Sequence, residues 1–284
     1  MTKIALCLLL FNLISYGYHP NLMKDPLILI SGKRHNLPLQ VKKKTERKLN
    51  ILLYSKTKAW RHIEAIAEAK KMFAVLANRH QWTLTISEDS VLFNPGTLKT
   101  YDVVIWLNVT GRTLSDQQRQ AFKNFLMDGG GFVGIHGSGD GSHQWDWYRD
   151  EVIRATFSHH PMHPQFQTAI LERECHTTSM DCSDLPIQWR WEDEWYVFKE
   201  SPRTKGVNVI YTLNERGLNL SQEEQTLATS EHPGKGNDHP VIWNHTVGKG
   251  KVFYSALGHK GSYYKNENHQ KLLVEAVKWT GNLN

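Results

Sequence analysis

The sequence predicts an α/β protein with a doubly wound, mostly parallel sheet. Two short continuous apolar runs, at 50–55 and 102–107, are typical of strands buried on both faces. Between and after these runs apolar residues recur at helical spacing, so strands alternate with helices. Such alternation implies parallel pairing through right-handed crossover connections. A chain of 284 residues, 40% of them hydrophobic, can bury one large core.

The first half of the predicted domain alternates regularly. The strand at 50–55 leads into a helix whose buried stripe consists of Ile63, Ile66, Ala67, Phe73, Leu76 and Ala77. A weakly alternating strand at 83–86 and the second apolar run follow. Another helix begins after Ser115, a good N-cap, and ends at Gly129–Gly131, because glycine accepts the left-handed conformation at low cost. Residues 132–135 are the next predicted strand.

The second half of the chain has a different pattern, in which strands follow one another with loops between them. A final helix at 270–279 closes the chain. The strands expected here are 167–171, 189–198, 208–213, 239–243 and 251–256.

The N-terminus has the pattern of a secretory signal peptide over residues 1–17. Lys3 precedes a mostly apolar stretch at 4–15, and small residues stand before a cleavage site at Tyr18. That stretch is shorter than the roughly 20 residues that span a bilayer, so we expect no stable membrane insertion after removal of the leader. An uncleaved anchor or a buried strand is the open alternative. The prediction is a periplasmic or secreted protein.

Residues 18–48 are polar, contain three prolines, and predict a basic tether that leads into a domain over 49–284. The formal net charge is +6, and part of this excess is the basic cluster of Lys42, Lys43, Lys44, Arg47 and Lys48. A nucleic-acid-binding face would be the functional interpretation of such a cluster. Because no zinc finger, helix-turn-helix or RNA-binding aromatic motif accompanies it, we expect a solvated linker and no nucleic-acid partner.

Two cysteines remain once the leader is removed, Cys175 and Cys182. In an oxidising compartment they can pair across a short loop. Their spacing matches no standard zinc motif, so we expect no metal site there, and whether the two cysteines form a local cross-link stays open.

Chemistry is expected where strands end, because ligands of open α/β sheets bind at the carboxyl ends of the strands. The strand at 132–135 runs into Gly134-Ile135-His136-Gly137-Ser138-Gly139-Asp140, a glycine-rich elbow that exposes His136. The run has neither the Walker spacing nor the dinucleotide fingerprint, so we expect no nucleotide cofactor.

Further clusters combine aromatic rings with histidines or carboxylates. They are Trp145-Asp146-Trp147-Tyr148, the histidine-rich segment 157–164, Glu192-Asp193-Glu194-Trp195-Tyr196 and Leu257-Gly258-His259. Aromatic faces suit the apolar C–H surfaces of sugar rings, whose hydroxyl groups bind carboxylates and imidazoles. Each cluster alone has an ordinary packing explanation; together, at predicted strand ends, they favour a sugar-like ligand.

These motifs in this order resemble the ThuA-like (trehalose-utilisation) family. The resemblance runs from about Asn50 to Gly281. Its motifs are Gly129–His136 with Gly139-Asp140, the Trp-x-Trp-Tyr run, Phe157 with the histidines that follow it, the segment 193–196, His239–Trp243, and Gly248–Tyr254 ending in Gly258-His259. It implies a flavodoxin-like, class I glutamine amidotransferase-like three-layer sandwich. It also implies a role in the use of trehalose and related disaccharides, including 3-keto sugars. The wider superfamily has a nucleophilic cysteine at the elbow, where this chain has His136, so a glutamine amidotransferase mechanism lacks its thiolate.

We therefore predict an enzyme that acts on a disaccharide, a glycoside or a 3-keto-sugar derivative by hydrolysis, elimination or isomerisation. The expected catalytic residues are His136, Glu194, His259 and Asp140. The expected substrate-binding residues are Trp145, Trp147, His160, His163, Trp195 and Tyr196. A divalent metal such as zinc, held by His136, His259 and Glu194, is an open variant of this site.

Two alternatives stay open at this point. A non-catalytic periplasmic sugar-binding or accessory protein would use the same residue types without turnover. A homo-oligomer is likewise compatible with the sequence.

Overall fold

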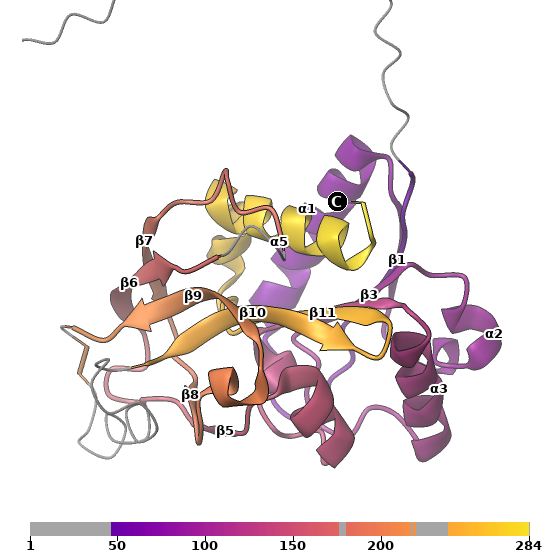
Figure 1. Ribbon diagram of the computed structural model, residues 1–284, viewed down its shortest axis with the longest axis horizontal. Coiled ribbons are helices and arrows are strands. Elements are labelled where there is room, and N and C mark those ends of the chain that lie inside the picture. Colours follow the sequence, from indigo (N-terminus) through magenta and orange to yellow (C-terminus); the bar gives the residue numbers. More distant parts are fainter. Residues whose placement is uncertain (1–46, 176–179, 217, 220–237, 284) are drawn as a thin grey trace, which may run out of the picture. The chain divides into compact units, whose positions relative to one another are not determined.

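Nine strands form the main sheet in a computed structural model of the chain, in the order β2-β1-β3-β4-β11-β10-β9-β6-β7 (Figure 1). The structure describes residues 47–175, 180–216, 218–219 and 238–283. The predicted leader at 1–17 and nearly all of the predicted tether at 18–48 lie outside the described residues. Among the residues described, no helix is long and apolar enough to cross a membrane.

One half of the sheet is parallel. It consists of β1 (Asn50–Tyr54), β2 (Thr83–Ser87), β3 (Val103–Leu107), β4 (Gly131–Ile135) and β11 (Gly250–Ser255). Every residue of β3 and β4 is buried, as expected for strands covered on both faces. The order of these five strands is that of a flavodoxin-like sheet. The predicted α/β fold class is confirmed.

The other half continues the sheet by antiparallel pairing. It consists of β10 (Pro240–Val247), β9 (Asn208–Asn214), β6 (Gln167–Arg173) and β7 (Gln188–Asp193). In this sheet β10 and β6 run against the other strands, which leaves seven of the nine pointing the same way. The carboxyl ends of β1, β3, β4, β11 and β7 therefore lie along one edge.

Helices cover both faces of the sheet and complete the three layers (Figure 1). On one face lie α1 (Ile63–His80) and α5 (Glu267–Thr280); on the other lie α2 (Pro95–Leu98) and α3 (Asp116–Met127). The predicted cap of α3 is present, because Ser115 and Gln118 form a reciprocal capping box. Single-turn 3-10 helices and one π-helix follow several strands: η1 (Ser90–Leu92), η2 (His136–Gly139), η3 (Tyr148–Ile153), η4 (Pro202–Lys205) and η5 (Gly261–Lys265).

The predicted strand at 189–198 is wrong as a single element. The chain leaves the main sheet at Asp193, and β8 (Val197–Phe198) pairs instead with β5 (Phe157–His159) in a separate two-stranded sheet. Aromatic residues continue on both sides of the break, at Trp189, Trp191, Trp195 and Tyr196, so the pattern does not reveal the bend. As a result, residues 194–196 lie outside the sheet.

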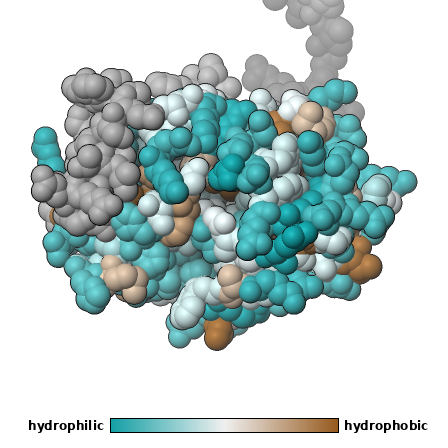
Figure 2. All heavy atoms as spheres, turned by 90° about the horizontal axis from the view of Figure 1, so that it is seen from below, coloured by the Kyte–Doolittle hydropathy of each residue, from teal (hydrophilic) through white to brown (hydrophobic). Residues whose placement is uncertain are grey.

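Cys175 and Cys182 form a disulfide bond between β6 and β7. This bond is the local cross-link that the sequence left open. On the face shown in Figure 2, hydrophilic residues predominate and hydrophobic ones are scattered, as is usual for a solvated surface.

Candidate functional site

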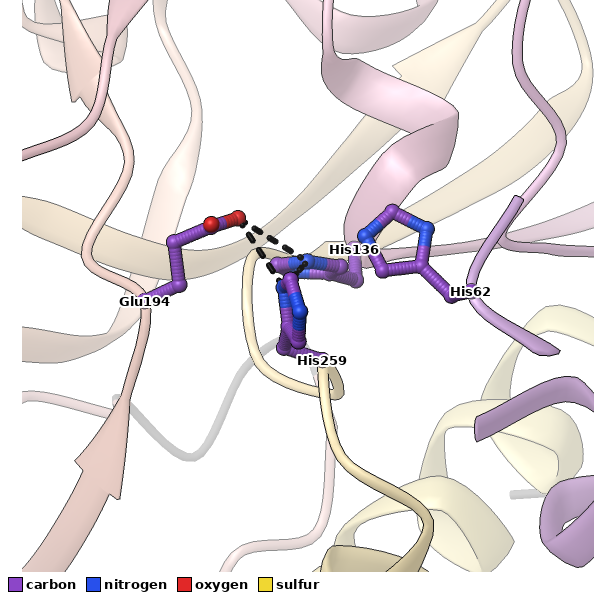
Figure 3. A group of neighbouring side chains, drawn as sticks. All are labelled: His62, His136, Glu194 and His259. Atoms are coloured by element: carbon purple, nitrogen blue, oxygen red, sulfur yellow. Dashed lines mark hydrogen bonds and ion pairs between the residues drawn. The ribbon is translucent and has the colours of Figure 1, made fainter. Parts of the chain in front are cut away.

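Four side chains converge beyond the carboxyl edge of the sheet: His62, His136, Glu194 and His259 (Figure 3). One ligand-type atom from each lies within 4.8 Å of the others. Each residue follows a strand that points to this edge, namely β1, β4, β7 and β11 in turn. The topology thus collects residues that are far apart in the sequence.

His136 is oriented by a hydrogen bond to the main chain. Its Nδ1 lies 2.7 Å from the carbonyl oxygen of Ala256, so Nδ1 carries the proton and donates. Nε2 is then the ring nitrogen that faces the other three residues. Histidine ligands of metals commonly donate from the other ring nitrogen to a carbonyl oxygen, which fixes the tautomer in this way.

Glu194 is 3% exposed, and its two carboxylate oxygens face different partners. Oε2 lies 3.1 Å from Nδ1 of His259 and 3.5 Å from Nε2 of His136. Oε1 accepts a hydrogen bond of 2.6 Å from Nε2 of Gln165 and lies 3.3 Å from Nε2 of His160. Oε2 therefore faces the histidines of the cluster, while Oε1 is bound by Gln165 and His160 outside it.

Three of the donor atoms have the spacing of a tetrahedral metal site. Nε2 of His136 and Nδ1 of His259 are 3.2 Å apart, and both are close to Oε2 of Glu194 at the distances given above. Ligand bonds of about 2.0–2.1 Å to zinc place the corners of a tetrahedron about 3.3 Å apart. The residues present therefore fit a small divalent cation with nitrogen and oxygen ligands.

His62 is the fourth member and is 7% exposed. Its ring packs edge-on against His136 and His259, with centroids 4.8 and 4.6 Å away. Burial, together with the neighbouring imidazoles of His136 and His259, lowers the pKa of His62 to about 2. The ring is therefore neutral and can offer a lone pair.

The carboxylate and the imidazoles stabilise one another's charges. Burial acts to lower the pKa of His136, but the hydrogen bond to Glu194 and the charge of Asp193 outweigh it, and the pKa is raised. Burial acts to raise the pKa of Glu194, but its hydrogen bonds with His136 and His259 hold that pKa far below the usual range. Glu194 is consequently ionised, as a metal ligand must be.

The sequence model of the ThuA family, described as trehalose utilisation, matches residues 50–280. The chain belongs to the ThuA family. The family is implicated in trehalose utilisation, and no curated protein matches the chain.

Solved structures share the fold of this ThuA domain. A ThuA-like protein from Bacteroides uniformis is 24% identical, with a TM-score of 0.65 over 83% of this chain and 92% of that one. A ThuA-like protein from Parabacteroides merdae is 15% identical, with a TM-score of 0.61 over 83% of this chain and 90% of the other. At these identities the likeness establishes the fold alone.

Two further residues predicted for the site, His160 and Tyr196, lie beside the four-residue cluster described above. The ring of Tyr196 lies 4.6 Å from that of His136 and forms a buried wall. His160 stacks nearly parallel to Tyr196 at 6.2 Å and keeps 25% of its side chain exposed. The structure therefore brings together five predicted residues: His136, Glu194, His259, His160 and Tyr196.

The remaining predicted residues lie elsewhere. Trp145 and Trp147 are half-buried, with the cations of Arg119 and Lys123 over their rings at 5.2 and 5.3 Å. Trp195 is 1% exposed, and its Nε1 donates to the carbonyl oxygen of Gln167. The carboxylate of Asp140 accepts a hydrogen bond from the main-chain N–H of Ser142. His163 is exposed and lies outside the cluster.

Sequence reasoning missed His62, Gln165 and Phe166. Gln165 binds Glu194, and the ring of Phe166 packs edge-on against His259 at 5.0 Å. A usable signal existed for His62, because it stands between the predicted first strand and the helix that begins at Ile63. That loop leaves the same edge of the sheet as the elbow. No comparable signal marks Gln165 or Phe166.

Proposed function

We propose that this ThuA protein is a sugar-utilisation enzyme with a divalent metal centre, such as zinc, formed by His62, His136, Glu194 and His259. Its substrate would be a keto derivative of a disaccharide or glycoside. The observation that carries the proposal is the tetrahedral spacing of three donor atoms, at 3.2, 3.1 and 3.5 Å. Four protein ligands would fill a tetrahedral shell, so the metal would have to accept a fifth ligand, and it would then supply a Lewis acid that polarises a carbonyl oxygen.

The carboxylates of the site support chemistry beside a carbonyl. Hydrolysis of a glycosidic bond by the common mechanism needs two carboxyl groups about 5–9.5 Å apart that both face the sugar. Among the described residues of the cluster, Glu194 is the one carboxylate with an oxygen directed at the histidines. Asp193 is fully buried, and both its oxygens accept hydrogen bonds from N–H groups. We therefore favour isomerisation or elimination of a 3-keto sugar, by proton transfer at the carbon next to the carbonyl.

His160 is the proposed proton carrier of this reaction. It contacts Oε1 of Glu194 at 3.3 Å and is the most exposed of the imidazoles around the site, with 25% of its side chain accessible, against 17% for His259. The ring of Tyr196 forms the neighbouring apolar wall. Such a wall limits the access of water to a reacting keto sugar.

Exchange of substrate hydrogen in heavy water tests the proposal. With 3-keto-trehalose or a 3-keto-glucoside, the metal-loaded wild type should exchange the hydrogen next to the carbonyl for deuterium and form product. His136→Ala should abolish both reactions while ligand-induced thermal stabilisation largely survives. His163→Ala is the matched control, because that histidine is exposed and outside the cluster.

A different outcome would favour the alternative function. If the wild type binds these sugars but neither exchanges hydrogen nor turns over any glycoside or keto-glycoside, with or without metal, a non-catalytic sugar-binding protein becomes the better account.

We further propose that the protein works in the periplasm or outside the cell. The bond between Cys175 and Cys182 supports this, because disulfides persist in oxidising compartments and are rare in the cytosol. Thiol labelling of fractionated cells should find both cysteines blocked in the exported fraction. Free thiols in a cytoplasmic pool would contradict the proposal.

A further inference from the structure

The sheet by itself does not bring Glu194 and His259 together. Glu194 follows β7, the outermost strand, and His259 follows β11, four positions away in the sheet. Strands lie about 4.8 Å apart, so the ends of these two strands would be about 19 Å apart in a flat sheet. The two side chains are nevertheless 3.1 Å apart. Another contact must hold the end of β7 close to the segment that follows β11.

Asp193 provides a contact of this kind. It is fully buried, and four N–H groups donate to its carboxylate. Oδ2 accepts from the main-chain N–H of Gly258 at 2.9 Å and from Nε1 of Trp191 at 3.0 Å. Oδ1 accepts from the main-chain N–H of Glu194 at 2.9 Å and from that of His259 at 3.4 Å.

These donors come from the two segments that carry the site. Trp191 and Glu194 belong to the β7 end, and Gly258 and His259 follow β11. The segment at 258–259 is tightly constrained, because Gly258 has a φ of 128° and a Cβ there would lie 2.5 Å from the hydroxyl oxygen of Tyr264. The Asp193 carboxylate thus joins the end of β7 to this constrained segment.

We propose that Asp193 is the positioning residue of the metal centre, and that its carboxylate sets the distance between the ligands Glu194 and His259. The inference rests on the proposed function, because it takes these two residues to be ligands. Asp193 acts only through the main chain and need not touch the metal or the substrate. Neighbours that orient ligands in this way typically contribute 10- to 100-fold to metal affinity.

Asp193→Asn is the direct test, carried out on the full chain with zinc or cobalt alone. The amide keeps the size of the side chain but replaces one acceptor oxygen with a donor that faces N–H groups. The affinity for zinc should fall about 10- to 100-fold. The absorption bands of the cobalt-loaded protein should shift, because the coordination geometry changes. Glu172→Gln is the control, since that exposed carboxylate accepts from Asn214, away from both segments, and it should leave both properties unchanged.

Two additions keep the test decisive. If Asp193→Asn fails to fold, Trp191→Phe takes its place. This variant removes one of the four donors while the carboxylate remains, and it should lower zinc affinity by a smaller factor. A readout without metal is the NMR shift of the His259 ring nitrogens in the apoprotein. In Asp193→Asn these nitrogens should lose the signature of the hydrogen bond with Glu194.

The outcomes separate this inference from the proposed function. Wild-type zinc affinity and an unchanged cobalt spectrum in Asp193→Asn would overturn the role of Asp193 and leave the metal centre intact. If the wild type binds no metal, the proposed metal centre is refuted. The NMR shift of the His259 ring nitrogens then decides by itself whether Asp193 sets the position of His259.

Discussion

His136 is held in a backbone conformation that few residues adopt. Its φ of 46° lies in the left-handed region, which costs a residue with a side chain about 1–2 kcal/mol. Two contacts compensate: the ring donates to the carbonyl of Ala256, and the N–H of the next residue, Gly137, donates to Oδ1 of Asn108 at 3.1 Å. Strain of this kind concentrates at functional sites, where the surroundings hold a side chain in one position.

Buried histidines outside the cluster make the stability of the fold depend on pH. Burial, reinforced by the charge of Arg154, lowers the pKa of His245 to about 3. Between that value and the unfolded pKa near 6.5, the unfolded chain binds one more proton than the native protein. The free energy of unfolding should therefore fall with acidification, by up to about 1.4 kcal/mol per pH unit for this group.

His245→Gln removes that proton-binding difference and keeps a donor for the carbonyl of Glu151, which His245 contacts at 3.0 Å. Urea unfolding of the variant between pH 6.5 and 4.5 should show a shallower loss of stability than the wild type. His163→Gln, at an exposed position, should leave the slope unchanged. Parallel slopes for wild type and His245→Gln would contradict the assignment.

Trp60 is the exposed aromatic residue closest in sequence to the cluster, two positions before His62. Its side chain is 70% exposed, and its carbonyl oxygen accepts a hydrogen bond of 2.6 Å from Oγ1 of Thr110, which fixes the loop. For a sugar substrate, Trp60→Ala should raise KM about 3- to 10-fold with little change in kcat, because it removes a stacking surface. Trp147→Ala should not, because a lysine already covers that ring. Equal KM values in steady-state assays of wild type and Trp60→Ala would refute the stacking role.

At the scale of elements, the register of two parallel strands places His136. β4 and β11 pair so that Ile135 lies beside Ser255. The next residue of each strand, His136 and Ala256, therefore emerge side by side, which explains the hydrogen bond between them. The position of the ring depends on the close packing of β11 against its neighbours.

Gly250 at the start of β11 is where that packing is tightest. A Cβ there would overlap the carbonyl oxygens of Leu126 and Gly130, both of them main-chain atoms. Gly250→Ala should lower the free energy of unfolding by about 2–4 kcal/mol, since backbone must move. Gly206→Ala should cost only about 1 kcal/mol, because that glycine has a positive φ but open space around it. Urea titration of both variants checks the contrast, and equal losses would contradict it.

At the scale of the whole molecule, the sequence predicted the three layers and the sheet edge that carries the site. It did not predict which distant residues meet at that edge. Continuous apolar runs and helical spacing identify a parallel sheet, and His136 follows from the elbow after its fourth strand. The meeting of Glu194 with His259 joins the ends of two strands that are four positions apart in the sheet. No local pattern predicts this meeting, because the contacts of Asp193 with the segment after β11 join residues 65 and 66 positions apart in the sequence.

Local patterns also indicated tryptophans that the structure uses for packing. Trp145 and Trp147 stand next to polar residues in the sequence, which is equally typical of a sugar site and of a covered surface. Arg119 and Lys123 come from α3, and only the folded chain shows that they cover these rings. His62 was missed for the opposite reason, since it is a lone histidine before a helix and joins the cluster only through the packing of the β1 loop.

The account depends most on the claim that His62, His136, Glu194 and His259 bind one divalent ion. Crystals of the protein soaked in a zinc salt, measured at the zinc absorption edge, test this directly. The account predicts one anomalous peak per chain within the cluster, about 2.0–2.2 Å from the ligand atoms of these residues. An empty cluster, with Nδ1 of His259 still hydrogen-bonded to Glu194 at saturating zinc, would contradict it.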